Sequence, residues 1–158
     1  MQIDQLKPHL IPTANSWVTY PKPNPQAKLR LFCFHYAGGG AVIFRSWADS
    51  LPSTVEVCPI ELPGRSSRLR ETPFTQMEPL IQTLAPAIFP HLNKPFAFFG
   101  HSMGGLVSFE LAQLLRKEYN QSPLHLFVSG CRAPQIPDRA SQIHALPETG
   151  IDQGITSL

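Results

Sequence analysis

The sequence predicts an α/β fold whose mostly parallel sheet carries helices on both faces. Four short apolar runs rich in strand-forming residues recur along the chain, and segments with helical spacing of apolar residues separate them. Glycine or proline stands at several of the junctions, as at 38–40 and 63–64. Strands that alternate with helices build parallel sheets, because a crossover helix returns the chain to the same end of the sheet.

The four apolar runs are the expected strands, at 29–34, 54–62, 95–99 and 124–130. The first, "LRLFCF", is closed by "HYAGGG", and a Pro-Gly turn stops the second. The run "PFAFF" leads directly into a glycine-rich turn, and "LHLFVSG" precedes a proline-broken loop.

Three helices are expected between or after these strands. The first spans 41–51, with Val42, Ile43, Trp47 and Leu51 at helical spacing. The second spans 77–91, although two internal prolines weaken it. The third spans 103–119 and has the clearest amphipathic pattern. Its expected buried face consists of Leu106, Val107, Leu111, Leu114 and Leu115.

Composition narrows the class of protein. A formal net charge of +2 with 15% charged residues gives no electrostatic case for a nucleic-acid partner.

Residues 1–27 are rich in proline and predict an extended N-terminal arm, followed by one domain at 28–158. No run has the length of a signal peptide core or a membrane span, so we expect a cytoplasmic protein without membrane contact. Three cysteines without CxxC spacing favour free thiols over a disulfide framework or a metal site.

The stretch Gly100-His101-Ser102-Met103-Gly104 stands between a predicted strand and the third predicted helix. This G-x-S-x-G pattern, in this setting, is typical of a nucleophile elbow, which lifts a serine hydroxyl clear of the sheet. Side chains two residues before and after the serine would collide with their neighbours, which explains the glycines, and Gly105 extends the small-residue patch. The alternative is a serine that only caps the helix.

Acyl transfer at such a serine requires donors for the developing oxyanion. The backbone N–H of Met103 is one expected donor, and the "HYAGGG" loop would supply the second from Ala37 or Gly38. The alternative for this loop is a flexible turn. It is not a dinucleotide site or a P-loop, because neither G-x-G-x-x-G nor GK[ST] is present.

Four motifs together, "LFCFHYAGGG", "ELPGR", "FFGHSMGG" and "VSGCRAP", resemble the type II thioesterases. These are α/β-hydrolases that accompany nonribosomal peptide and polyketide synthetases. The resemblance covers 29–146. It implies hydrolysis of acyl thioesters on the phosphopantetheine arm of an acyl or peptidyl carrier protein, which clears misprimed or stalled chains, with no cofactor or metal of its own.

By this resemblance Ser102 is the nucleophile, with Met103 and the Ala37–Gly38 segment as the oxyanion hole. His101 is expected to serve local packing, and Arg65 of "ELPGR" to be a solvated surface residue.

The family pattern continues with an acid and a histidine that this sequence does not match. The order in this fold is Ser, then Asp or Glu, then His. After Ser102 the histidines are His125 and His144, and the aspartates are Asp138 and Asp152. We expect a packed or half-exposed His125 inside the fourth strand and place His144 in a loop. The sequence therefore resembles the N-terminal part of a thioesterase, with an incomplete C-terminal part. We expect it to be inactive alone unless a second chain supplies Asp and His.

Two other functions remain open at the level of sequence. The chain could be a non-catalytic remnant that binds a carrier protein or acyl groups. It could also be part of a general serine esterase or lipase, which shares the elbow but not the register of all four motifs.

Overall fold

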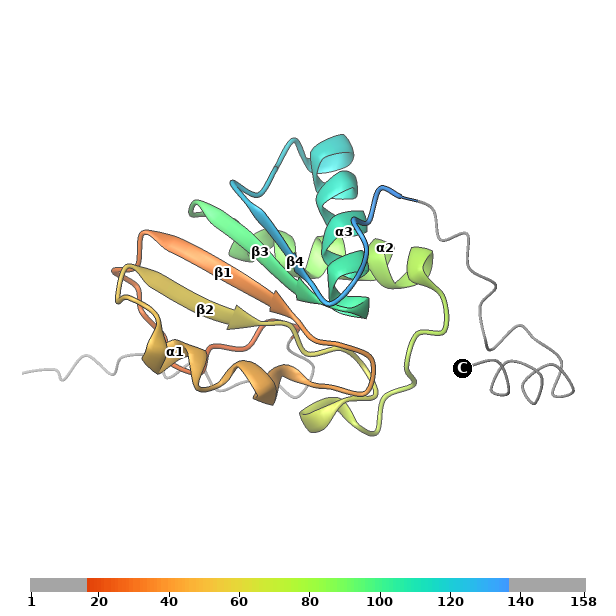
Figure 1. Ribbon diagram of the computed structural model, residues 1–158, viewed down its shortest axis with the longest axis horizontal. Helices are drawn as coiled ribbons and strands as arrows, with labels where there is room; N and C mark the ends of the chain where they lie inside the picture. The colour runs from red at the N-terminus through yellow and green to blue at the C-terminus, as the bar shows by residue number, and fades with distance from the viewer. Residues whose placement is uncertain (1–16, 137–158) are drawn as a thin grey trace, which may run out of the picture.

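Figure 1 shows the ribbon of the computed structural model, which describes residues 17–136. Four parallel strands form one sheet in the order β2-β1-β3-β4. The strands are β1 (Leu29–Phe34), β2 (Val55–Pro59), β3 (Phe96–His101) and β4 (Leu126–Ser129). Because all four run the same way, their carboxyl ends share one end of the sheet, where ligand sites of such sheets lie. The predicted parallel α/β architecture is confirmed.

Helices lie on both faces of the sheet. They are α1 (Trp47–Ser50), α2 (Met77–Ile88) and α3 (Met103–Tyr119), with short 3-10 helices η1 (Ala41–Phe44), η2 (Ser66–Arg68) and η3 (Phe89–His91). Successive side chains of β1 point to opposite faces. Phe32 and Phe34 therefore join the large apolar cluster under α2 and α3, while Cys33 joins a smaller cluster with Phe44 and Trp47. No helix among the described residues is long and apolar enough to cross a membrane.

The expected helix at 41–51 is wrong in detail. The chain instead forms η1 and then the four-residue α1. The buried positions are Ala41 and Phe44, with Trp47 packed beside them, whereas Val42 is 61% exposed. A spacing of three residues matches a 3-10 helix rather than an α-helix. Contacts of Phe44 and Trp47 with the Phe99 ring select this spacing, since they place both rings against the sheet.

The other predicted elements are confirmed, with shifted ends. The helix expected at 77–91 is α2 continued by η3, and the helix expected at 103–119 is α3. The face of α3 that packs on the sheet runs through Val107, Leu111 and Leu115, so Leu106, expected on the buried face, is instead 42% exposed. Pro79 is tolerated because it lies in the first turn of α2, where backbone N–H groups have no intrahelical partner. β2 and β4 are shorter than the apolar runs that predicted them.

Part of the expected N-terminal arm packs on the domain. Val18 is buried and bridges Ile60 in antiparallel fashion, just after β2. The Thr19 N–H donates to the Pro59 carbonyl at 2.9 Å, and the Glu61 N–H donates to the Trp17 carbonyl at 2.9 Å. The described end of the arm thus lies along the segment that leads into "ELPGR". The rest of the predicted arm lies outside the described residues.

Candidate active site

Ser102 occupies a strained turn between β3 and α3. Its backbone angles are φ 53° and ψ −117°, which residues other than glycine rarely adopt. Such a conformation costs about 1–3 kcal/mol and persists only where the surrounding structure enforces it. The Ser102 side chain makes no capping hydrogen bond to α3. The alternative of a helix-capping serine is therefore not supported, and the hydroxyl is free of that role.

Close backbone packing explains the glycines around Ser102. A side chain on Gly100 would strike the Gly104 carbonyl and, at 2.6 Å, the Gly105 Cα. A side chain on Gly104 would strike the carbonyl group of Phe34 and, at 2.7 Å, that of His35. The collisions expected from the motif are thus present. They also place the start of α3 directly against the end of β1.

Hydrogen bonds also hold the elbow in place, including one to the last residue of β4. The Ser102 N–H donates to the Ser129 carbonyl at 2.8 Å, and the Gly105 N–H donates to the Ser102 carbonyl at 2.9 Å. The His101 Nδ1 lies 3.2 Å from the Ser129 hydroxyl, and its ring meets the Tyr36 ring edge-on at 5.9 Å. His101 therefore serves local packing, as expected.

The glycine loop after β1 lies beside the elbow. Phe34 pairs with Gly100 across the sheet, so the loop starts next to the turn that carries Ser102. The Gly39 N–H donates to the Tyr36 carbonyl at 3.0 Å, and Gly38 has φ +83°. These are the marks of a type II turn, in which the third position requires a positive φ. The loop thus contains a hydrogen-bonded turn centred on Ala37 and Gly38.

Backbone N–H groups near Ser102 are left free. As the first residue of α3, Met103 has an N–H with no partner inside the helix. In the described part of the chain, the N–H groups of Ala37 and Gly38 donate to no protein atom, and both residues are exposed. The structure therefore brings the elbow and the glycine loop together and leaves donors on each available to a negatively charged oxygen.

No described histidine is hydrogen-bonded to the Ser102 hydroxyl. His35 is buried and bonded to the Tyr36 carbonyl, and His91 is paired with a tyrosine hydroxyl. His125 is exposed and precedes β4, so the expected packed or half-exposed histidine inside the strand is wrong. The strand is shorter than its apolar run because its pairing with β3 begins only at Leu126. The positions Asp138, His144 and Asp152 lie outside the described residues.

The "ELPGR" segment braces the glycine loop in a way that sequence reasoning missed. Glu61 is 3% exposed, and its Oε1 accepts the Ala41 N–H at 3.2 Å, at the far end of the loop. Buried Arg68 donates from Nη1 to the Glu61 carbonyl at 3.0 Å and stacks on Trp17 at 4.3 Å. Arg65, expected as a solvated residue, is half-buried. The available signal in the sequence was Glu61, a charged residue just after a buried strand. Such a residue lies at the carboxyl end of the sheet, beside the candidate site.

Arg68 also forms a two-bonded ion pair with Glu71. Its Nε and Nη2 atoms donate to the two carboxylate oxygens at 2.8 and 2.6 Å. These hydrogen bonds lower the pKa of Glu71 below its ordinary value. Arg68 thus holds the segment after "ELPGR" in place, which in turn fixes Glu61 beneath the glycine loop.

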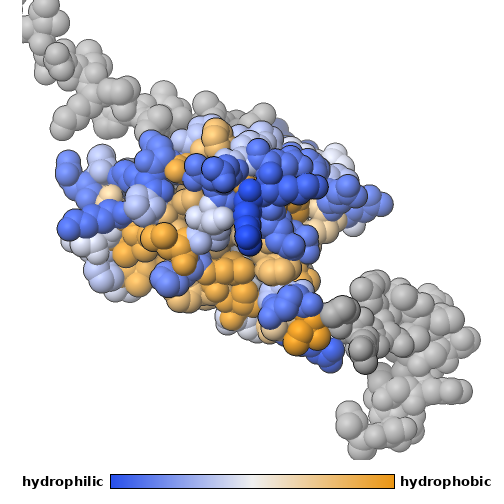
Figure 2. Space-filling view, turned by 90° about the horizontal axis from the view of Figure 1, so that it is seen from above, coloured by the Kyte–Doolittle hydropathy of each residue, from blue (hydrophilic) through white to orange (hydrophobic). Residues whose placement is uncertain are grey.

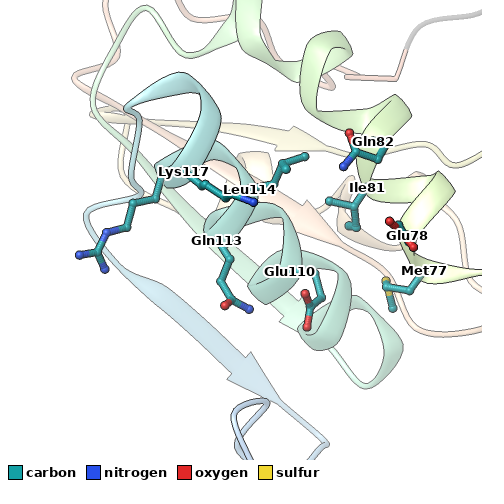
Figure 3. Close-up of a pocket in the computed structure, with 9 residues that line it drawn as sticks. Met77, Glu78, Ile81, Gln82, Glu110, Gln113, Leu114 and Lys117 are labelled. Atoms are coloured by element: carbon teal, nitrogen blue, oxygen red, sulfur yellow. The ribbon is translucent and has the colours of Figure 1, made fainter.

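An open groove lies away from the elbow, between α2 and α3, and Figure 3 shows the side chains around it. Its lining comes from Met77, Glu78, Ile81, Gln82, Glu110, Gln113, Leu114, Arg116 and Lys117. None of these residues belongs to the elbow or the glycine loop. Within residues 17–136 no group of three or more His, Cys, Asp or Glu residues could hold a metal ion, and Cys33, Cys58 and Cys131 are free thiols.

The family model described as a thioesterase domain matches residues 29–156. The chain belongs to the thioesterase domain family. The α/β-hydrolase-type fold and the resemblance to type II thioesterases inferred from four motifs are thereby confirmed. The match begins at the first residue of β1 and includes both the glycine loop and the elbow.

Solved structures share the fold. RedJ, a thioesterase from the prodiginine pathway of Streptomyces coelicolor, is 43% identical, with a TM-score of 0.71, and the match covers 86% of this chain and 51% of RedJ. The type II thioesterase BorB, from the borrelidin biosynthetic cluster, is 30% identical, with a TM-score of 0.73, and the match covers 89% of this chain and 57% of BorB.

A curated relative, linear gramicidin dehydrogenase LgrE of Brevibacillus parabrevis, is 49% identical over 152 residues, or 96% of this chain and 57% of LgrE. The chain thus spans little more than half the length of the relatives it matches. LgrE is named a dehydrogenase, whereas this sequence has no G-x-G-x-x-G dinucleotide motif.

Proposed function

We propose that this chain supplies the nucleophile and the oxyanion hole of a serine thioesterase. The observation that carries the proposal is the strained Ser102 turn, with the free N–H of Met103 on one side and the glycine loop on the other. A strained serine between a parallel strand and a helix costs free energy and needs a function to explain it. Acyl transfer is the chemistry that this arrangement serves.

In the proposed reaction the Ser102 oxygen attacks the thioester carbonyl carbon while a general base takes the hydroxyl proton. Met103 and the Ala37–Gly38 segment donate hydrogen bonds to the oxygen that becomes negative. The carbon–sulfur bond then breaks, the thiol leaves with the proton, and the acyl chain remains on Ser102. Water attacks this ester in the second half of the cycle, which releases a carboxylic acid and restores the serine.

We propose that the acid and the histidine of the triad come from a second chain or from a part of the fold outside the described residues. This follows from the absence, within residues 17–136, of a histidine bonded to Ser102. Without such a base the serine hydroxyl is a poor nucleophile at neutral pH.

The proposed substrate is an acyl or peptidyl chain on the phosphopantetheine arm of a carrier protein, and the proposed role is editing of a nonribosomal peptide or polyketide synthetase. Support comes from the similarity to RedJ and BorB, which are named thioesterases of biosynthetic pathways. The thioesterase itself needs no cofactor in this scheme. The proposed location is the cytoplasm, together with the synthetase.

Labelling with an alkyl fluorophosphonate tests the nucleophile directly. In the presence of a fragment of a full-length relative that carries the triad acid and histidine, we expect the reagent to attach at Ser102, as found by peptide mass analysis, and the Ser102→Ala variant to stay unlabelled. Labelling that persists in this variant, or none in either protein, would favour a non-catalytic remnant.

A second comparison tests the substrate class. With the missing triad residues supplied by a fragment of a full-length relative, acyl carrier-protein thioesters should be cleaved faster than free esters of the same acyl chain. The reverse preference would favour a general esterase.

A further inference from the structure

The Tyr36 carbonyl oxygen receives two hydrogen bonds. The first comes from the Gly39 N–H at 3.0 Å and closes the turn of the glycine loop. The second comes from the His35 ring, whose Nδ1 lies 2.8 Å from the same oxygen. A carbonyl oxygen can only accept, so Nδ1 carries the hydrogen in this bond. Two donors on one oxygen fix the direction of the Tyr36–Ala37 peptide unit.

That direction determines where the Ala37 N–H points. In a trans peptide the C=O and the following N–H are coplanar and point opposite ways. The Tyr36 carbonyl faces the buried imidazole, so the Ala37 N–H faces away from it, on the exposed side of the loop. There it has no partner in the described part of the chain. The peptide that carries the Gly38 N–H has no comparable double restraint.

His35 is suited to this task as a neutral ring. It is 1% exposed, and its Nε2 is a buried atom with no hydrogen-bond partner in the described structure. With the hydrogen on Nδ1, Nε2 bears a lone pair, whereas protonation would bury an N–H without an acceptor. Burial lowers the pKa of His35 and outweighs the hydrogen bond to the Tyr36 carbonyl and the nearby Glu61, which both raise it, while Arg65 lowers it further. The ring therefore stays uncharged at neutral pH.

We propose that His35 is a positioning residue that aims the Ala37 N–H as the second oxyanion donor, so that Ala37 and not Gly38 completes the hole with Met103. The inference rests on the proposed serine hydrolase function. Glu61 holds the other end of the same loop through the Ala41 N–H, so the loop is restrained on both sides of Ala37. An oxyanion hole works because its donors are in place before charge develops. The hydrogen bond from His35 holds the Ala37 N–H in place in this way.

A pair of variants separates positioning from packing. In His35→Asn the side-chain amide nitrogen is as many bonds from the backbone as Nδ1 and keeps a donor for the Tyr36 carbonyl. His35→Leu fills a similar space without a donor. Thermal unfolding of both variants checks that each is folded. The readouts are the second-order rate of fluorophosphonate labelling at Ser102, measured with the triad acid and histidine supplied by a fragment of a full-length relative, and the ¹⁵N order parameter of the Ala37 amide in the free 158-residue chain.

We expect labelling to slow about tenfold in His35→Leu, less than the roughly 100- to 1,000-fold lost with a whole oxyanion donor. The Ala37 order parameter should fall from about 0.85, typical of rigid backbone, toward 0.6. His35→Asn should restore both. An Ala37 amide equally rigid in His35→Leu, or equal effects of the two variants, would overturn the proposal. If wild-type Ser102 takes no label, the proposed function fails, and the order parameters still decide whether His35 orients Ala37.

Discussion

Ser102 keeps a costly backbone conformation because Gly104 lets the start of α3 approach the end of β1. Replacing Gly104 with valine would force a branched side chain into the carbonyl groups of Phe34 and His35. We expect Gly104→Val to destabilise the fold by about 3 kcal/mol or more and to abolish labelling of Ser102. Urea unfolding and fluorophosphonate labelling measure both effects. Leu106→Val, at an exposed position of the same helix, is the control and should stay close to wild type.

Gly38 offers a second test at the level of one residue, since its φ of +83° excludes proline, whose φ is near −65°. Gly38→Pro should reshape the turn and slow Ser102 labelling on the order of 100-fold, comparable to the loss of one oxyanion donor. Asparagine tolerates positive φ, so Gly38→Asn should label at nearly the wild-type rate. Equal rates in the proline variant and wild type would move the second donor away from this loop.

Burial also makes His35 a source of pH-dependent stability. Its pKa is lowered in the folded state, as is that of His91 through burial and the nearby Arg30. The unfolded chain therefore binds more protons once the pH falls below about 6.5, the ordinary histidine pKa. We expect the free energy of unfolding to be greatest above this pH and to decline as the pH is lowered toward the folded-state pKa values. The decline should be shallower in His35→Asn, and identical slopes would contradict the assignment.

At the scale of elements, β4 forms an edge of the sheet within the described residues. Figure 2 shows apolar surface gathered in one broad area of the face in view. Large apolar side chains are exposed at β4 and just before it, with Phe127 at 51% and Leu124 at 62%. An unpaired apolar edge is a template for pairing with another strand.

We therefore expect the purified chain to self-associate, and Phe127→Lys to reduce the association by placing a charge on the edge. Sedimentation velocity at several concentrations measures it. Val42→Lys removes another exposed apolar side chain, 61% exposed, on η1, far along the chain from β4, and serves as the control. If both variants self-associate as strongly as the wild type, β4 does not form the contact between chains.

At the scale of the whole molecule, the chain covers 57% of LgrE and 51% of RedJ. We expect negligible carrier-protein deacylation by the 158-residue chain alone. Within residues 17–136 no histidine is bonded to Ser102, and a serine without a histidine retains only binding and oxyanion effects, about 1,000- to 10,000-fold over water. Co-expression with a fragment of a full-length relative that carries the later strands, Asp and His should restore solubility and turnover together. Robust turnover by the purified monomer, lost in Ser102→Ala, would contradict this prediction.

The sequence by itself determined the features that depend on short-range pattern. Apolar periodicity was enough for the parallel strands and for α3, since each depends on residues close together in the chain. The elbow was also predictable, because the spacing of Gly100, Ser102 and Gly104 expresses a local steric requirement. The four motifs in order were enough to predict the thioesterase family.

Only the tertiary structure decided what surrounds those motifs. The contact of Glu61 with the Ala41 N–H depends on how the loops after β1 and β2 pack, as does the burial of the His35 ring. The 3-10 geometry of η1 likewise follows from aromatic contacts with Phe99, a residue more than fifty positions away. Such contacts have no local signature, because their free energy comes from groups that only the folded sheet brings together.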